Sequence, residues 1–210
     1  KDWMAQLVQK SEKGGTDRSI WAIDRGVNIC HTLLLSPAHL IGDRDSAAHD
    51  AWAWAEEHGA HVHAFPPAKD FTDTELALKI AAELMPCALV ILTGAFGGRF
   101  DHLTSAASVA AHAALPCILA DERESLFFLH GDESLTITCD SPPQAISLLP
   151  FTEECTGITT NGLRWELNGS QIHSHSSTAI SNVLAEGNTE HRFSVALRRG
   201  ILGVYLCHKE

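Results

Sequence analysis

The hydrophobic pattern changes near residue 130, and this change constrains the fold more than any other feature of the 210-residue chain. Before it, short apolar runs typical of strands alternate with segments of helical periodicity, as expected of a parallel sheet covered by helices. After it, helical periodicity stops, and short segments rich in Ser, Thr, Ile and Val follow one another between turns. The sequence therefore predicts an α/β domain over residues 1–130 and an antiparallel β-sandwich or small barrel over residues 131–210.

One apolar run in the first half is especially informative. Residues 88–93 (Ala-Leu-Val-Ile-Leu-Thr) are continuously apolar up to the final threonine, which is typical of a central parallel strand buried on both faces. The pattern also predicts a helix over residues 73–85, because its apolar residues recur at helical spacing. Further strands are expected at residues 20–23, 60–65 and 117–120. A short apolar segment lies at residues 40–41, and an Ala-rich helix is expected at about 101–114.

The second half contains six segments that are typical of short strands. Asn168-Gly169 stands between two of them, and Asn-Gly between alternating segments is a strong signal for a β-hairpin. The expected strands are residues 135–139, 145–149, 157–167, 171–175, 192–197 and 201–207.

The composition excludes several classes of partner. A formal net charge of -11 makes nucleic acid an unlikely ligand, because an acidic surface repels the phosphate backbone. No apolar run reaches the roughly 20 residues that cross a bilayer, and we expect a cytoplasmic protein. The six cysteines form no CxxC pair, so we expect reduced, mostly buried thiols and no zinc site.

Acidic residues follow the short apolar segment at residues 40–41. Asp43 and Asp45 lie in the segment Gly42-Asp43-Arg44-Asp45-Ser46, where a parallel sheet would present them beyond the carboxyl end of a strand. Two carboxylates there suit magnesium, which prefers hard oxygen ligands. A polar loop whose acids only cap a helix explains the same residues equally well.

A second acidic segment, Asp70 to Glu75, precedes the predicted helix. Thr72 and Glu75 form the pattern of a capping box, which needs no function to explain it. Asp73 would lie in the first helical turn, where the helix dipole favours a carboxylate. Asp70 has no such structural explanation, and Asp70 and Asp73 together add two acids near a strand exit.

A glycine-rich loop, residues 94–102, lies between the predicted buried strand and the Ala-rich helix. Gly97 and Gly98 let a backbone approach a phosphate closely, and a helix start offers free N–H groups. Arg99 supplies a forked cation for phosphate oxygens, and Asp101 adds a carboxylate. A bare glycine turn is the alternative; the presence of Arg and Asp in one loop favours a phosphate site.

Trp165 has two interpretations from the pattern alone. It is either a core aromatic of the second domain or an exposed ring that stacks on a flat heterocycle. The histidine pairs at residues 61 and 63, and at 173 and 175, alternate along predicted strands, but no third ligand stands at a recognisable spacing. We therefore expect surface histidines there.

Taken together, five motifs resemble those of the thiamine pyrophosphokinase family. The family motifs are Gly-Asp-Phe-Asp-Ser, Asp-x-Thr-Asp, Gly-Gly-Arg-x-Asp-His, Thr-x-Gly-Leu-Lys-Trp-x-Leu and a later Ser-Asn pair. The order and spacing agree from Asp24 to the C-terminus. Two departures stand out: Arg44 replaces the usual aromatic, and Asp24-Arg25-Gly26 replaces Asp-Gly-Gly. The corresponding segments here are residues 42–46, 70–73, 94–102, 160–167 and 181–182.

The resemblance implies a Rossmann-like catalytic domain with helices on both faces of its parallel sheet, over residues 1–130. It also implies a thiamine-binding β-sandwich over residues 131–210, and a homodimer whose active sites are shared between subunits. The implied reaction moves a pyrophosphoryl group from ATP to thiamine, with Mg²⁺, and gives thiamine diphosphate and AMP. Such a reaction depends on charge neutralisation and positioning more than on a protein nucleophile.

The resemblance also assigns roles to individual residues. Four acids would hold magnesium, namely Asp43, Asp45, Asp70 and Asp73. The nucleotide and its phosphates would be bound by Asp24, Thr72, Gly97, Gly98, Arg99 and His102. The catalytic residues would be Arg99 with Asp73 and Asp101, either of which could orient or deprotonate the thiamine hydroxyl. Thiamine would be bound by Trp165, Ser181 and Asn182.

Two other functions fit the same features less well. A diphosphokinase acting on a pterin alcohol could use the same α/β core, but the Gly-Leu-Arg-Trp segment of the second half argues against it. A nucleotide- or thiamine-binding regulator without turnover would be favoured by the loss of one of the acids, and all of them are present.

Overall fold

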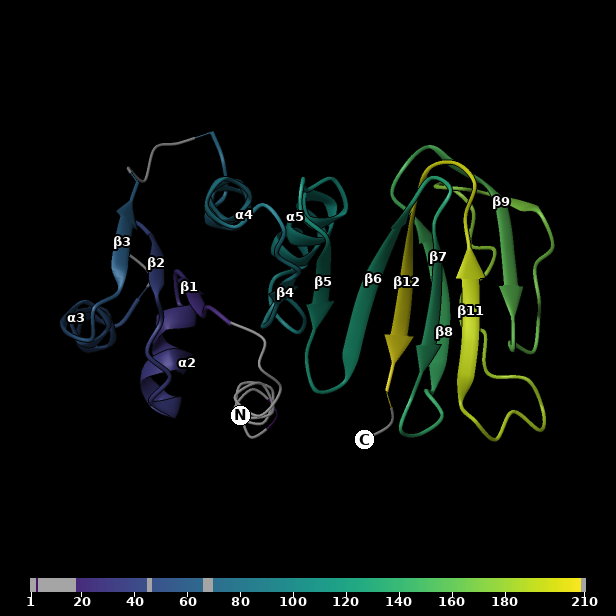
Figure 1. The fold of residues 1–210 in the computed structure, drawn as a ribbon, viewed down its shortest axis with the longest axis horizontal. Coiled ribbons are helices and arrows are strands. Elements are labelled where there is room, and N and C mark those ends of the chain that lie inside the picture. The colour runs from purple at the N-terminus through teal and green to yellow at the C-terminus, as the bar shows by residue number, and fades with distance from the viewer. Residues whose placement is uncertain (1–2, 4–17, 45–46, 66–69, 209–210) are drawn as a thin grey trace. The chain divides into compact units, whose positions relative to one another are not determined.

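The computed structural model describes residue 3 and residues 18–44, 47–65 and 70–208. The chain forms two compact units, the first up to Cys87 and the second from Ala88 onward. Figure 1 shows their helices and strands. The division into domains at residue 130 stays a prediction.

The first unit contains the expected parallel sheet. Its strands are β1 (Trp21–Ile23), β2 (His39–Gly42) and β3 (His61–Ala64), in the order β1-β2-β3, and both pairs are parallel. The helices α2 (Gly26–Leu33) and α3 (His49–Glu57) connect these strands, and α4 (Asp73–Leu84) follows β3. The expected helix at residues 73–85 is therefore confirmed.

One core cluster of the first unit lies on one face of this sheet. Ala22 and Leu40 are buried there against α2 and α3, whose buried residues are Val27, Cys30, Ala51, Trp52 and Ala55. Because side chains alternate along a strand, the neighbours Trp21 and His39 lie on the opposite face.

That opposite face carries a cluster of three imidazoles, His39, His61 and His63. His39 Nδ1 and His63 Nε2 are 2.9 Å apart in a hydrogen bond, and the His61 ring meets both other rings edge-on. Trp21 lies beside His39, with ring centroids 4.0 Å apart. The pKa values of His39 and His63 are lowered, first by burial and then by the neighbouring imidazoles.

The second unit begins with a five-stranded sheet in the order β4-β5-β6-β12-β8. Only β4 and β5 are parallel, and α5 (Phe100–Ala111) connects them. The strands are β4 (Val90–Leu92), β5 (Cys117–Ala120), β6 (Glu124–His130), β12 (Ile201–Cys207) and β8 (Ala145–Pro150).

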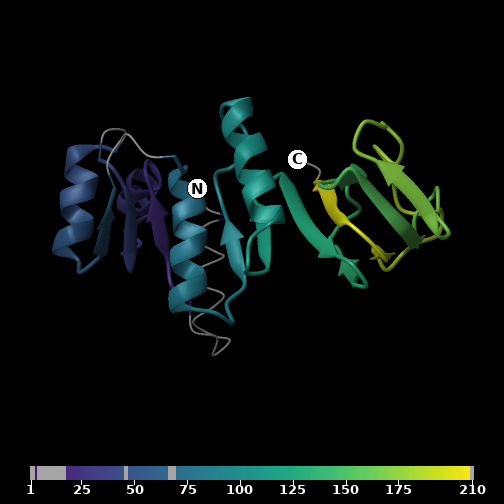
Figure 2. The ribbon, with the colours of Figure 1, turned by 90° about the horizontal axis from the view of Figure 1, so that it is seen from above.

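The second sheet of this unit has four antiparallel strands in the order β10-β9-β11-β7. Its inward residues share one hydrophobic core with the five-stranded sheet; Ile158, Phe193 and Val195 meet Ile146 and Val204 there. The strands are β10 (Ser170–His173), β9 (Glu154–Asn161), β11 (Arg192–Ala196) and β7 (Ser134–Thr138). Figure 2 shows the second unit from another side.

One expectation about the sheet is corrected. The run at residues 88–93 was expected to form a strand buried on both faces, but in this unit β4 covers only Val90–Leu92, and Ile91 is 39% exposed. β4 pairs with β5, and the other edge of β5 is taken by β6, which returns antiparallel after a short turn. Within the five-stranded sheet of this unit, β4 is therefore an edge strand.

All six cysteines are free, and Cys30, Cys117 and Cys155 are buried. Burial raises the pKa of the Cys117 thiol to about 11, which keeps it protonated at neutral pH. Within the described part of the chain, no helix is long and apolar enough to cross a membrane.

Candidate active site

Asp24 and Gly42 meet at the carboxyl ends of neighbouring parallel strands. The Asp24 N–H donates to Ile41 O at 2.9 Å. A Cβ at position 42 would lie 2.6 Å from Asp24 Oδ1, and Gly42 has φ +148°. The residue at 42 must therefore be glycine for the Asp24 carboxylate to keep this position.

Arg44 is attached to helix α3. Its guanidinium forms an ion pair with Glu56 and lies over the Trp52 ring, 5.2 Å from the ring centroid. Trp52 is a core residue, only 3% exposed. The residue next to Asp43 is thus anchored by contacts that its spacing in the sequence does not reveal. Asp45 lies outside the described residues.

The second acidic segment leads into α4. Thr72 is the N-cap, and its Oγ1 accepts a hydrogen bond from Glu75 N at 3.2 Å, as the capping pattern predicts. Asp73 lies in the first turn of α4 and is partly buried, whereas Asp70 is exposed. The capping bond uses the Thr72 hydroxyl, for which a nucleotide contact was expected.

The described acids do not form a finished metal centre. Among the described residues, no group of three or more His, Cys, Asp or Glu side chains is arranged to hold a metal ion. The acids of the two acidic segments supply carboxylate oxygens, a ligand type that suits magnesium.

The glycine-rich loop of the second unit ends at the start of α5. Gly97 has φ +78°, a conformation that favours glycine. Arg99 is the N-cap residue of α5, and its side chain makes no capping hydrogen bond. Because the cap is not filled by its own side chain, this helix start can offer backbone N–H groups to an anion.

Arg99 and Asp101 pair with each other on this loop. Arg99 Nε and Nη2 donate to Asp101 Oδ1 and Oδ2 at 3.1 and 2.6 Å. The pair raises the pKa of Arg99 and lowers the pKa of Asp101, chiefly through these hydrogen bonds. Both side chains are mostly exposed, 72% and 62%, so the pair is accessible to a ligand. His102 is also exposed, and its N–H donates to Asp101 Oδ1.

Trp165 is exposed and not a core residue. It is 57% exposed, and the Arg164 guanidinium lies 5.2 Å from its ring centroid. Of the two interpretations of this tryptophan, the exposed ring is the one that the structure gives.

Ser181 and Asn182 differ in their surroundings. Ser181 is exposed and has φ +60°, a strained conformation for a residue with a side chain, and its N–H donates to Ser147 Oγ at 3.0 Å. Asn182 is 8% exposed, and its side chain bonds both backbone groups of Trp165. Only Ser181 of this pair presents its side chain to solvent.

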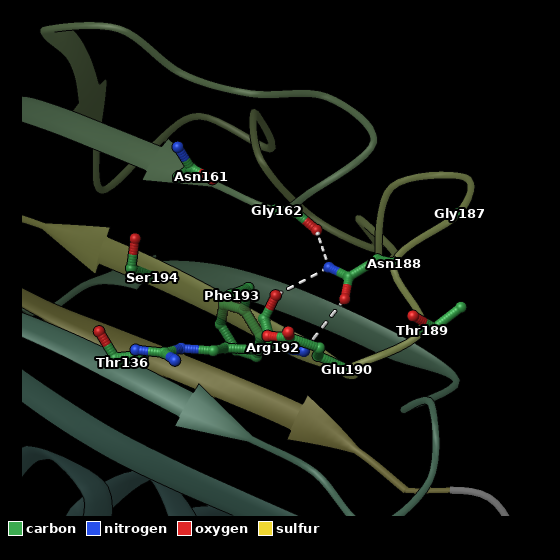
Figure 3. A pocket seen from close by; sticks show the side chains of 10 residues that line it. All are labelled: Thr136, Asn161, Gly162, Gly187, Asn188, Thr189, Glu190, Arg192, Phe193 and Ser194. Atoms are coloured by element: carbon green, nitrogen blue, oxygen red, sulfur yellow. Dashed lines mark hydrogen bonds between the residues drawn. The ribbon is translucent and has the colours of Figure 1, made fainter.

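A cavity of about 420 Å³ lies on the four-stranded sheet and the loop that leads into β11. Figure 3 shows that the Asn188 side chain lies between Gly162 and Arg192 at this cavity. Asn161 and Gly162 belong to the segment that resembles the family's Thr-x-Gly-Leu-Lys-Trp motif, but Trp165, Ser181 and Asn182 do not line the cavity.

Four residues that hold candidate site residues in place within their own unit were not expected from the sequence. Glu56 and Trp52 anchor Arg44, Ser147 holds the Ser181 backbone, and Asn188 holds Gly162. No motif marks any of them, because each is a common residue type that acts through one contact with a distant segment.

The fold combines a parallel sheet with antiparallel sheets, and its loops carry acids, glycines and a paired arginine, the groups that a phosphate-transferring enzyme uses. Comparison with known proteins specifies the class further. Residues 15–118 match the family described as "Thiamin pyrophosphokinase, catalytic domain", and residues 134–202 match "Thiamin pyrophosphokinase, vitamin B1 binding domain". The chain belongs to the thiamin pyrophosphokinase family, whose members are transferases.

Individual relatives agree with this assignment. The chain is 28% identical over 194 residues to the thiamine pyrophosphokinase of Bacillus subtilis (strain 168), which covers 90% of this chain and 88% of the relative. The crystal structure of thiamine pyrophosphokinase from Bacillus subtilis has a TM-score of 0.79 at 25% identity, over 94% of this chain and 92% of that one. The crystal structure of thiamin pyrophosphokinase from Geobacillus thermodenitrificans has a TM-score of 0.76 at 26% identity, over 93% of this chain and 89% of that one.

Proposed function

We propose that this chain transfers a pyrophosphoryl group from ATP to the hydroxyl of thiamine and releases AMP. The observation that carries the proposal is the pair of family matches, one to a catalytic domain and one to a vitamin B1-binding domain, in order along one chain. The acids, the arginine and the exposed tryptophan that the reaction needs stand in the matched regions.

Magnesium is the cofactor that the donor set suits. Asp43, Asp45, Asp70 and Asp73 would hold it, since each supplies hard carboxylate oxygen. When bound, magnesium neutralises phosphate charge during transfer.

The nucleotide side of the reaction depends on the two acidic segments and the glycine-rich loop. Arg99 would bind phosphate oxygens in a bidentate manner, exchanging its present partner Asp101 for the phosphate. The carboxylate that this exchange releases could then orient or deprotonate the thiamine hydroxyl, with Asp73 as the other candidate. The remaining nucleotide contacts would come from Asp24, Thr72, Gly97, Gly98 and His102.

Thiamine would be bound by residues of the second unit. The exposed Trp165 ring offers a flat surface for the pyrimidine ring, and the exposed Ser181 offers a hydroxyl for its edge. The strained backbone at Ser181 supports a functional role, because such conformations concentrate at ligand sites.

The domain organisation, the location and the oligomeric state in this proposal rest on family membership. We propose a Rossmann-like catalytic domain over residues 1–130, a thiamine-binding β-sandwich over residues 131–210, and a cytoplasmic homodimer. Each active site of the dimer would combine the catalytic domain of one subunit with the thiamine-binding domain of the other. Co-purified dimers of Asp73→Asn and Trp165→Ala would then recover activity, because one of the two mixed sites carries neither change.

A turnover assay tests the function directly. The purified chain is incubated with ATP, MgCl₂ and thiamine, and AMP and thiamine diphosphate are measured. A parallel reaction replaces thiamine with a hydroxymethylpterin. AMP release that depends on thiamine supports the proposal; release only with the pterin, or thiamine binding without turnover, would replace it with one of the two alternative functions.

A further inference from the structure

The orientation of the Trp165 ring depends on how its backbone is held, because most of its side chain is surrounded by solvent. Both backbone polar groups of Trp165 bond to one side chain. The Trp165 N–H donates to Asn182 Oδ1 at 3.2 Å, and Asn182 Nδ2 donates to Trp165 O at 2.7 Å. The Asn182 amide therefore pairs with Trp165 as a neighbouring β-strand residue would.

Asn182 is itself fixed to the core of the second unit. Its backbone exchanges both hydrogen bonds with Ile146 of β8, at 2.7 and 2.8 Å, and Ile146 is fully buried. Its Oδ1 also accepts from Val183 N at 2.9 Å. A side-chain amide has two donor hydrogens and two acceptor sites, and three of these four are used inside the chain.

These contacts leave Asn182 little capacity for a ligand and give it a different task. We propose that Asn182 is a positioning residue, which aims the Trp165 ring and acts on thiamine binding through Trp165 rather than by touching thiamine. The effect on thiamine binding rests on the proposed function of Trp165 as the thiamine contact. The positioning of the ring does not.

The chain offers a matched control in Asn188. Its Nδ2 donates to Gly162 O and Arg192 O at 2.9 and 2.7 Å, and its Oδ1 accepts from Arg192 N at 3.2 Å (Figure 3). Asn188→Ala thus removes three bonds between a side-chain amide and the backbone from the same unit, as Asn182→Ala does, without removing a bond to Trp165.

The first measurement needs no ligand. The protein is labelled with 5-fluorotryptophan, and the ¹⁹F signal of Trp165 is assigned among the five tryptophans by its loss in Trp165→Phe. We expect Asn182→Ala to shift and broaden this signal, and Asn188→Ala to leave it in place. An unchanged Trp165 signal in folded Asn182→Ala overturns the proposal.

The second measurement is a double-mutant cycle on the KM for thiamine. We expect Trp165→Ala to raise this KM roughly tenfold, the order of a lost aromatic stack, and Asn182→Ala to raise it less. The double variant should match Trp165→Ala alone. If the two increases multiply, Asn182 contacts thiamine independently and the proposal is wrong.

A second variant protects the test against misfolding. Asn182→Asp keeps the oxygen that accepts from Trp165 N and Val183 N but loses the amide that donates to Trp165 O. It should also shift the ¹⁹F signal, because the second carboxylate oxygen cannot donate to Trp165 O. If Asn182→Ala does not fold, Asn182→Asp decides the cycle. A thiamine KM that is unchanged in Trp165→Ala would refute the proposed thiamine contact, while the ¹⁹F result would still decide whether Asn182 positions the ring.

Discussion

Trp165→Ala separates a binding role from a packing role, and the exposed fraction of Trp165 sets the expected size of each effect. Complete burial of a large aromatic side chain removes about 150–250 Å² from water. Trp165 is 57% exposed, so about 43% of that area, roughly 65–110 Å², is covered. At about 25 cal/mol per Å², removing the Trp165 side chain lowers the free energy of unfolding by about 2–3 kcal/mol. This is an upper limit, because unfolded chains already cover part of this surface.

The expected change in melting temperature follows from this limit. For a chain of this size about 1 kcal/mol corresponds to about 2–4 °C, and alanine recovers part of the lost contact, so we expect a decrease of a few degrees. Phe193→Ala is the matched control in the same unit, because Phe193 is 2% exposed in the core. The free energy of unfolding of Phe193→Ala should be lower by about 3–5 kcal/mol.

The assay combines calorimetry of both variants with steady-state kinetics of Trp165→Ala. We expect the KM for thiamine to rise sharply while the KM for ATP changes much less. The reasoning is refuted if Trp165→Ala melts as early as Phe193→Ala, since the ring would then be a packing residue. It is also refuted if both KM values remain those of the unmodified protein.

Three other predictions test the nucleotide side and the first unit. Turnover should require Mg²⁺ or Mn²⁺ and disappear in excess EDTA, and Asp73→Asn should lower kcat by orders of magnitude with an unchanged melting temperature; normal rates would remove Asp73 from the site. Arg99→Lys should lose much of the activity and Arg99→Ala nearly all of it, because lysine keeps the charge but not the fork, and equal AMP release by Arg99→Ala would contradict a phosphate role. Folding lowers the pKa values of His39 and His63, so the unfolded chain binds more protons below about 6.5 and stability should fall as pH drops below that value. Urea unfolding at several pH values should show that the free energy of unfolding decreases less in His63→Gln as pH drops. An equal decrease in both proteins would exclude the histidine cluster as a source of the pH dependence.

The sequence predicted elements well where one local signal was sufficient. β5 and β12 begin and end at the expected residues, 117–120 and 201–207, and the Asn168-Gly169 signal does lie between the antiparallel strands β9 and β10. Helix α4 was expected from the helical spacing of its apolar residues, and the Thr72 cap agrees with the capping pattern before it. By contrast, α2 and α3 have Arg25 and Ala48 as N-cap residues without a side-chain cap, so the sequence contains no start signal for them.

Strand pairing was harder to predict than strand position. β6 lies where the pattern changes from helical to alternating, and the expected elements leave residues 124–130 unassigned. This strand determines how β5 continues into the antiparallel part of the five-stranded sheet. Periodicity reports which face of a strand is buried, but it does not report which strand lies beside it.

The residue types of the site could be predicted, but their contacts could not. Arg44 and Glu56 are 12 positions apart, and Asn182 and Trp165 are 17 apart, so neither spacing corresponds to a helical turn or a hairpin. Arg44 stands where the family usually has an aromatic residue, yet its guanidinium lies over the Trp52 ring and so stays attached to the core of its unit. A motif therefore contains residues of two kinds, those whose side chains are exposed and those that hold the exposed ones in place. Burial and hydrogen-bond partners, which only the folded chain provides, distinguish Ser181 from Asn182 within a single dipeptide.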